Sequence, residues 1–222
     1  IPFILLVFLS GILVLWGWLR PSSDNFNKLT TYSTIPVEST LMDGGGYFPY
    51  FSISPDGRTV AFSSDKGIQL RSLSDFSAKV VEGTERATQV AFSPDGQSLI
   101  FEKDGQIYRI GVTGSPKSVV YSKGPGGGMS WGIDGYIYFS PAFGTDGIWR
   151  ISANGGEPEQ LTSVIDSLGE NIHTWPQLLP DSKTLLFTAL GPSGGSLDSR
   201  IVIQQLNSGE RKVLIDKAIF GY

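Results

Sequence analysis

The sequence predicts an all-β protein, a β-propeller of four-stranded blades preceded by one transmembrane helix. Three observations predict this architecture. A hairpin motif recurs four times along the chain, two further strand-like segments follow each copy, and an uncharged apolar stretch opens the sequence. Four strands in a repeat of about 40 residues are typical of a propeller blade, whereas a β-helix has much shorter repeats.

The opening stretch, residues 1–19, carries no charged side chain. At about 1.5 Å per residue it spans roughly 28 Å, close to the hydrocarbon thickness of a bilayer. Trp16 and Trp18 lie at its end, where interfacial aromatic residues belong. We therefore expect residues 1–20 to form a transmembrane helix that anchors the chain in a membrane through Ile1 to Leu19. A signal peptide and a buried core helix are the alternatives, although no A-x-A-like cleavage site follows.

Residues 21–40 are polar and rich in Ser and Thr, as in a linker. Within them, residues 29–37 form a candidate strand that would join the last blade and close the ring. Because the chain starts at Ile1 rather than Met and stops soon after an apolar run, we expect it to be a fragment of a longer protein.

One aspartate marks each copy of the hairpin, at spacings of 39, 39 and 47 residues: Asp56, Asp95, Asp134 and Asp181. An apolar residue lies three positions before each aspartate, and a phenylalanine lies five or six positions after it. Pro-Asp-Gly favours a tight turn because Pro presets φ, Asp bonds to nearby backbone and Gly accepts positive φ. The third copy has Ile133 in place of Pro and the fourth has Ser182 in place of Gly. We expect both turns to form, because the aspartate is retained.

Two more apolar segments follow each hairpin and complete a blade. Third strands are expected at 67–73, 106–112, 147–153 and 200–206, and fourth strands at 78–83, 117–122, 159–162 and 211–216. The blades then cover about 41–84, 85–124, 125–170 and 171–222, and the propeller region 41–222 is C-terminally incomplete. Residues 124–128 (GPGGG) lack the strand-then-helix context of a phosphate loop, so we expect a loop between the second and third blades.

The element Phe92-Ser93-Pro94-Asp95-Gly96 resembles the WD-repeat-like repeat of TolB-type propellers. A later run is similar to the C-terminal region of bacterial membrane-anchored Ser/Thr protein kinases of the eukaryotic type. That run comprises Gly147-Ile148-Trp149-Arg150, Asn154-Gly155-Gly156-Glu157-Pro158, Leu161-Thr162 and His173-Thr174-Trp175-Pro176-Gln177-Leu178-Leu179-Pro180-Asp181. The resemblance covers essentially the whole chain. It implies a cytoplasmic kinase domain before Ile1, one membrane helix and a ring of six or more blades, of which four are visible here.

Composition excludes several function classes. The formal net charge of −4, from 17 basic and 21 acidic side chains, argues against nucleic-acid binding. Cys is absent and His173 is the sole histidine, so thiolate and multi-histidine metal sites are excluded. We expect no metal and no cofactor.

Catalytic motifs are equally scarce. The sequence contains no Gly-rich nucleotide loop with its lysine, no H-R-D run and no D-F-G. Residues 191–195 (GPSGG) match G-x-S-x-G, but they lie in a Gly/Ser loop rather than at a strand-to-helix elbow. We therefore expect no nucleophile at Ser193 and no catalytic residue in this chain.

Binding residues are predicted from position alone. Loops that lead into the innermost strand of each blade gather at one mouth of a propeller's central channel. Aligned on the turn aspartates, these loops contain Tyr47, Phe48, Thr88, Gln89, Gly127, His173 and Thr174. His173 is interpreted first as a loop residue at the start of a blade, with ligand contact as the alternative. Trp131, Trp149 and Trp175 fall at strand positions, where packing between blades is favoured over binding.

These features predict a non-catalytic, membrane-anchored propeller that acts as a sensor or scaffold and holds a protein, peptide or glycan on one face. The resemblance implies a receptor-like Ser/Thr kinase that is single-pass, with the propeller extracytoplasmic or periplasmic. Two alternatives stay open. One is the propeller region of a prolyl-oligopeptidase-like peptidase, and the other is a TolB-like periplasmic protein of the cell envelope.

Overall fold

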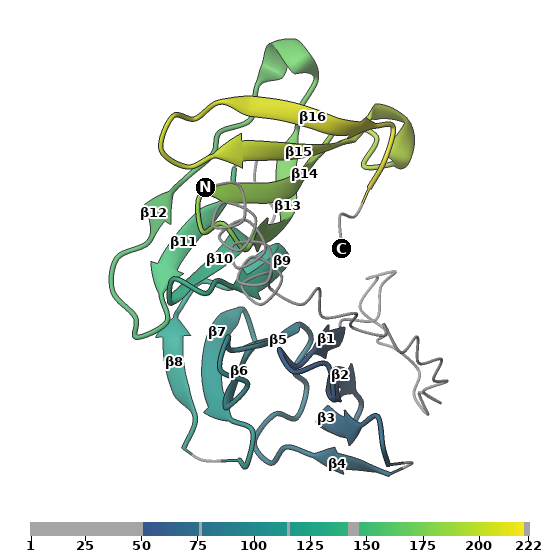
Figure 1. Ribbon diagram of the computed structural model, residues 1–222, viewed down its shortest axis with the longest axis vertical. Helices are drawn as coiled ribbons and strands as arrows, with labels where there is room; N and C mark the ends of the chain where they lie inside the picture. Colours follow the sequence, from purple (N-terminus) through teal and green to yellow (C-terminus); the bar gives the residue numbers. More distant parts are fainter. Residues whose placement is uncertain (1–50, 76, 115, 142–146, 220–222) are drawn as a thin grey trace, which may run out of the picture. The chain divides into compact units, whose positions relative to one another are not determined.

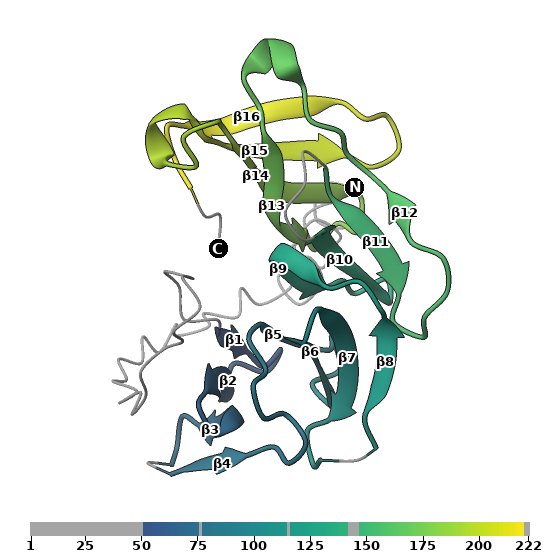
Figure 2. The same cartoon turned by 180° about the vertical axis from the view of Figure 1, so that it is seen from behind.

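The computed structural model describes residues 51–75, 77–114, 116–141 and 147–219. Within these ranges the chain forms sixteen β-strands and two short 3-10 segments, η1 (Asp166–Leu168) and η2 (Ser196–Asp198). The strands make four antiparallel sheets of four strands each, shown in Figure 1 and from behind in Figure 2. No helix in this part of the chain is long and apolar enough to cross a membrane. The predicted membrane segment 1–20, the linker 21–40 and the candidate strand 29–37 lie outside the described residues.

Each sheet is a meander in which consecutive strands pair, and we call the sheets the first to fourth blades in chain order. The first blade holds β1 (Phe51–Ile53), β2 (Thr59–Ser64), β3 (Gly67–Ser72) and β4 (Ala78–Val80). The second holds β5 (Val90–Phe92), β6 (Ser98–Lys103), β7 (Gln106–Gly111) and β8 (Ser118–Tyr121). The third holds β9 (Pro125–Trp131), β10 (Tyr136–Pro141), β11 (Trp149–Ser152) and β12 (Glu159–Gln160). The fourth holds β13 (Ile172–Leu178), β14 (Thr184–Leu190), β15 (Arg200–Gln205) and β16 (Arg211–Asp216).

The four hairpin turns share one hydrogen-bond pattern. In each, Oδ1 of the turn aspartate accepts a hydrogen bond from the backbone N–H two positions later, at 2.9–3.2 Å. The residue after the aspartate has positive φ in all four: Gly57 (70°), Gly96 (69°), Gly135 (82°) and Ser182 (56°). The prediction for the third and fourth turns is therefore confirmed, because the aspartate supplies the bond whether Gly or Ser follows it.

In the second, third and fourth blades, the apolar residue before the turn and the phenylalanine after it pack against the preceding blade. In the second blade, Phe92 and Phe101 join a buried cluster with Ala61 of the first. The third and fourth blades repeat this arrangement with the pairs Trp131–Phe139 and Leu178–Phe187. The sequence repeat is therefore also the packing unit, since buried apolar area joins each of these blades to the one before it.

A buried threonine near the end of the outer strand caps the start of the third strand in two blades. Ile68 N–H donates to Thr84 Oγ1 at 2.9 Å in the first blade, and Ile148 N–H donates to Thr162 Oγ1 at 2.7 Å in the third. A glycine before each isoleucine leaves room for this approach. A Cβ added at Gly67 would lie 2.8 Å from Thr84 Oγ1.

Two inner strands begin earlier than predicted. β9 includes Pro125–Gly128, which we expected to form a loop, and β13 begins at Ile172, so His173 and Thr174 lie within a strand. Both strands change register part-way along their partners, as in a β-bulge. The loop predictions were based on the GPGGG sequence of residues 124–128 and on the position of His173 at the start of a blade. A bulge also interrupts the two-residue alternation that marks a strand in sequence. All four strands of the fourth blade come from residues 172–216.

Ser182 carries a side chain at a left-handed position, and this gives a stability test. Ser182→Gly should raise the free energy of unfolding by about 1 kcal/mol, because left-handed backbone penalises a Cβ atom. Chemical denaturation of the full chain measures the change. Gly96→Ser, in the matching turn of the second blade, is the control and should lower stability by a similar amount. A Ser182→Gly variant no more stable than the parent would contradict this account of the turn.

Candidate functional site

A cleft of about 510 Å³ runs over the inner strands of all four blades. Each inner strand contributes to its wall: β1, β5, β9 and β13. The lining residues are Phe51, Ser52, Ile53, Pro55, Gln89, Val90, Ala91, Phe92, Ser93, Pro94, Gly128, Met129, Ser130, Trp131, Ile133, Trp175, Gln177 and Leu178. The cleft is therefore a shared property of the repeats rather than of one loop.

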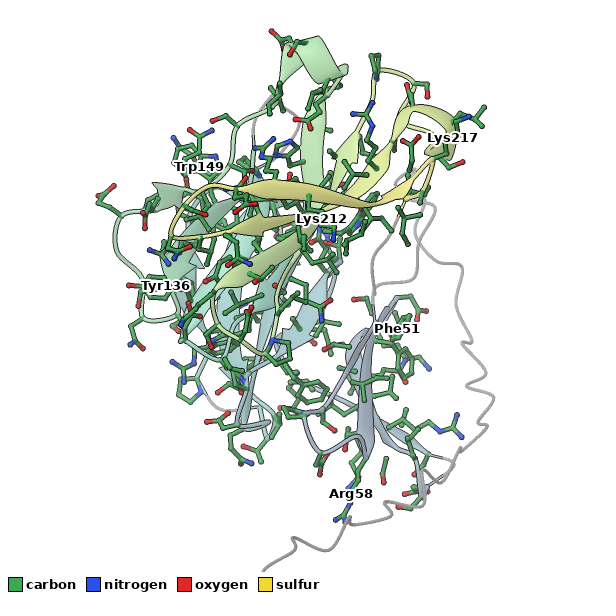
Figure 3. All side chains as sticks on the ribbon, turned by 45° about the horizontal axis from the view of Figure 1, so that its top comes forward. Phe51, Arg58, Tyr136, Trp149, Lys212 and Lys217 are labelled. Atoms are coloured by element: carbon green, nitrogen blue, oxygen red, sulfur yellow. The ribbon has the colours of Figure 1, made fainter. Side chains whose placement is uncertain are left out.

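Equivalent positions of the repeat supply most of the apolar wall. The residue three before each turn aspartate lines the cleft in every blade: Ile53, Phe92, Trp131 and Leu178. The residue just before the aspartate lines it in three blades: Pro55, Pro94 and Ile133. Ile53 is 53% exposed and Ile133 is 61% exposed, and Phe51, labelled in Figure 3, is 58% exposed. Exposed apolar side chains that gather in one concave region are typical of a binding surface.

No charged side chain lines the cleft among the described residues; its polar members are serines and glutamines. Ser52 Oγ accepts the backbone N–H of Phe92 at 3.2 Å and so joins the first two inner strands. Gln89 is only 5% exposed, and its Oε1 atom has no hydrogen-bond partner within the described part of the chain. Ser130 Oγ is buried and likewise lacks one there. An unpaired buried acceptor is unfavourable, so a ligand with a matching donor would gain by pairing with it.

The two bulges meet at the wall of the cleft. The register of β9 on β10 shifts around Gly128, whose φ is +97°, and that of β13 on β14 shifts around Trp175, whose φ is +50°. A bulky residue at positive φ costs roughly 1–3 kcal/mol and persists only where its surroundings hold it. A Cβ at Gly128 would lie 2.7 Å from Cδ1 of Trp175, so the glycine allows the indole to pack on the β9 backbone. The bulges thereby set where Trp175 stands in the wall.

An arginine of the second blade contacts the indole ring of Trp131. The guanidinium carbon of Arg109 lies 5.2 Å from the centroid of the indole, a cation–π contact. Arg109 Nη1 also donates to Asn154 Oδ1 at 3.3 Å. Trp131 packs against the core cluster between the second and third blades and also lines the cleft. Packing and lining are therefore combined in one residue, whereas we had weighed them as alternatives.

The seven residues predicted at the channel mouth take different places. Tyr47 and Phe48 lie outside the described residues. Gln89 lines the cleft, whereas Thr88 is half-buried beside it and donates to Glu102. Gly127 and Thr174 pack against each other: a Cβ at Gly127 would lie 2.6 Å from Thr174 Cγ2. The prediction from loop position thus identified one residue of the cleft lining, Gln89. A better signal is the apolar residue three positions before each turn aspartate, since it lines the cleft in all four blades.

His173 is fully buried and lies outside the cleft lining. Its Nδ1 lies 2.7 Å from Thr162 Oγ1, and its Nε2 lies 3.0 Å from Glu170 Oε2. Burial lowers the pKa of His173, although the Glu170 carboxylate opposes that shift. Burial alone would raise the pKa of Glu170, but the hydrogen bonds from His173 and the Ile165 N–H, together with the charge of Arg211, lower it. The pair therefore consists of a neutral imidazole and an ionised carboxylate near pH 7.

In the G-x-S-x-G match, the serine contacts a carboxylate and not the histidine. Ser193 Oγ donates to Asp198 Oδ1 at 2.6 Å, and this bond contributes most to lowering the pKa of Asp198. The ring nitrogens of His173 are engaged by Thr162 and Glu170 instead. Across the described ranges no three His, Cys, Asp or Glu side chains come together as metal ligands would.

Solved structures of propellers are similar to this chain. TolB from Acinetobacter baumannii matches with a TM-score of 0.62 and 20% identity, over 75% of this chain and 43% of that chain. Putative TolB from Agrobacterium tumefaciens matches with a TM-score of 0.63 and 20% identity, over 75% and 64%. A puromycin hydrolase S511A mutant complexed with PGG matches with a TM-score of 0.52 and 16% identity, over 80% and 31%. No family model matches the chain, and no curated protein matches it.

These likenesses show the fold, an all-β arrangement of four four-stranded antiparallel sheets like those of TolB-type propellers. The chain spans less than two thirds of the length of each of these structures. The resemblance to TolB-type propellers drawn from the repeat motif is confirmed at the level of fold.

The contact between Gly128 and Trp175 can be tested by adding a methyl group. Gly128→Ala should lower the free energy of unfolding by about 2–4 kcal/mol, because the methyl group adds a clash with the indole to the penalty of positive φ. Gly155→Ala is the matched control, since Gly155 has φ +86° and its nearest neighbour, Val120 O, lies 3.6 Å away. It should lose only about 1 kcal/mol. Equal losses in the two variants, measured by chemical denaturation, would show that the indole contact contributes nothing.

Proposed function

We propose that this chain is a non-catalytic propeller of the cell envelope that binds an uncharged, apolar segment of a protein or peptide in the cleft over its inner strands. One observation carries the proposal: the four inner strands together line a concave, mostly apolar surface that holds no charged side chain among the described residues. Sites for phosphate, nucleic acid or acidic peptides require cations at the contact surface, and none of the described residues that line this cleft supplies one.

The side chains of the cleft favour a peptide over a glycan. Aliphatic groups such as Ile53, Met129 and Ile133 match apolar side chains. The unpartnered acceptor on Gln89 matches a backbone N–H of an extended segment. Trp131 and Trp175 would also suit the apolar face of a sugar, so a neutral glycan is the competing ligand.

The cell-envelope location rests on two supports. The fold is TolB-like, and a periplasmic TolB-like protein is the role that this likeness favours among those considered. The uncharged stretch 1–19 would tether the propeller to the membrane, with the cleft outside the cytoplasm. In that arrangement the cleft would meet proteins of the envelope, and the chain would act as a scaffold.

A sensor role in a Ser/Thr kinase is the second candidate. It is favoured by the similarity of the run from Gly147 to Asp181 to the propeller region of such kinases and by the order of apolar stretch, linker and propeller. Ligand binding in the cleft would then be transmitted through the membrane segment. Phosphorylation by the parent protein that changes when a cleft ligand is added would support this role, and unchanged phosphorylation would exclude it. A peptidase is less favoured, because the TM-score to puromycin hydrolase, 0.52, is lower than the values of 0.62 and 0.63 to the TolB structures.

Ile133 allows a direct test of the cleft. Twelve-residue peptides selected from a display library on the full chain are labelled with fluorescein, and their affinity is measured by anisotropy. Ile133→Glu should weaken binding at least about tenfold, because it puts a charge on an apolar contact at an exposed position where folding is undisturbed.

Leu197→Glu is the matched control. Leu197 is also apolar and 81% exposed, but it lies outside the cleft lining. It should bind the selected peptides as the parent does. If the affinity of the peptides is unchanged in both variants, or falls equally in both, the cleft is not their binding site. If only glycans bind the chain, the competing ligand is favoured.

A further inference from the structure

A chain of buried hydrogen bonds links the third blade to the fourth. Ile148 N–H donates to Thr162 Oγ1 at 2.7 Å, and Thr162 Oγ1 lies 2.7 Å from Nδ1 of His173. The other ring nitrogen, Nε2, lies 3.0 Å from Glu170 Oε2. Thr162, His173 and Glu170 are all buried. The chain of hydrogen bonds therefore runs from the residue before β11 through the segment between the blades into the inner strand β13.

The same carboxylate fastens the connecting segment to the outer strand of the fourth blade. Glu170 Oε2 also accepts Ile165 N–H at 2.8 Å and Arg211 Nη1 at 3.3 Å. Arg211, on β16, in turn donates through Nη2 to Ser163 O at 2.7 Å and through Nε to Gln204 Oε1 at 2.6 Å. In Figure 3, Lys212 marks the strand that carries this arginine. One buried carboxylate oxygen thus holds three donors from three parts of the joint.

The proton positions follow from the donors and acceptors. Nε2 faces an ionised carboxylate, which only accepts, so Nε2 carries the hydrogen. Thr162 Oγ1 already accepts from Ile148, and its single hydrogen is then free to go to Nδ1. A neutral His173 with hydrogen on Nε2 satisfies every member of the chain.

We propose that this hydrogen-bonded chain is an acid-sensitive joint, in which a proton taken up from solvent at Nδ1 of His173 loosens the connection between the third and fourth blades. Once Nδ1 carries a hydrogen it cannot accept one from Thr162. The hydroxyl hydrogen of Thr162 is then displaced inside a buried site. The imidazolium also shares its carboxylate with the Arg211 guanidinium, so two cations compete for Glu170.

The charged groups that face the His173 ring come from two of the elements packed against it. Glu170 comes from the connecting segment and Arg211 from β16. The Ile148 amide comes from the residue before β11, and β14 contributes the uncharged ring of Phe187 at 4.6 Å. Burial disfavours the protonated ring more than Glu170 favours it, and Arg211 disfavours it further, so the pKa of His173 is lowered. Opening of the joint restores an ordinary pKa near 6.5, so acid favours the open form below about pH 6.5.

The first blade contains the same threonine cap without a titratable group. Thr84 Oγ1 accepts Ile68 N–H at 2.9 Å and donates to Val81 O, so no histidine takes part. Ile68 and Ile148 are both fully buried. The two amides are therefore matched reporters, one with the proposed device and one without it.

Amide hydrogen exchange of the full chain, expressed as protection factors corrected for intrinsic pH dependence, tests the joint. From pH 7.5 to pH 5.5 the protection of Ile148 N–H should fall by up to about tenfold relative to that of Ile68 N–H, because one pH unit below the ordinary histidine pKa shifts a linked equilibrium tenfold. Ile165 N–H, bonded to Glu170, should follow Ile148. Parallel behaviour of Ile68 and Ile148 would overturn the proposal.

His173→Gln separates histidine from carboxylate. Its amide retains a donor and an acceptor but does not titrate, so the loss of protection between pH 7.5 and pH 5.5 should disappear. A loss that remains in this variant would overturn the proposal, since another group would then be responsible. If the variant fails to fold, the comparison of Ile148 with Ile68 in the parent protein still decides the matter. The joint is independent of what the cleft binds, so its failure would leave the proposed function untouched.

Discussion

A four-stranded sheet has two faces, and in this chain an internal blade buries both only against its neighbours. This constraint explains why the apolar residue before each turn and the phenylalanine after it recur in every copy. They are the contacts that one blade presents to the blade before it, as Phe92 and Phe101 do toward Ala61. Everything else in the described structure is arranged around that stacking, including the cleft, because the inner strands converge where the sheets pack.

The features that could be predicted from sequence depend on short-range chemistry. An aspartate that bonds to the backbone two residues later forms its turn without help from distant residues, so the turns were predicted even where Ile133 or Ser182 replaced the usual residue. The strands of regular alternation were also predicted, since their pattern follows from one buried face. The starts of β9 and β13 were not, because Gly128 and Trp175 occupy bulges that interrupt the pattern.

The candidate cleft was only partly predictable for a related reason. Loop position identified Gln89, but most of the wall comes from residues that serve two purposes at once. Trp131 packs into the core between two blades and also lines the cleft, so its strand position alone indicated packing. The hydrogen-bonded joint at His173 could not be predicted from the sequence. Its partners Thr162 and Arg211 lie 11 residues before it and on the outer strand β16, and only the fold brings them together.

Comparison of the repeats shows how one scaffold acquires local differences. Thr84 and Thr162 have the same role, since the hydroxyl of each accepts a hydrogen bond from a backbone amide at the start of a third strand. The hydroxyl of Thr84 donates a hydrogen bond to Val81 O in its own blade, whereas the hydroxyl of Thr162 contacts His173 of the next blade. The backbone geometry is retained while the hydroxyl changes partner. The joint between the third and fourth blades therefore contains a titratable group while the sheets stack as they do elsewhere. The repeats differ here in side-chain chemistry and not in backbone fold.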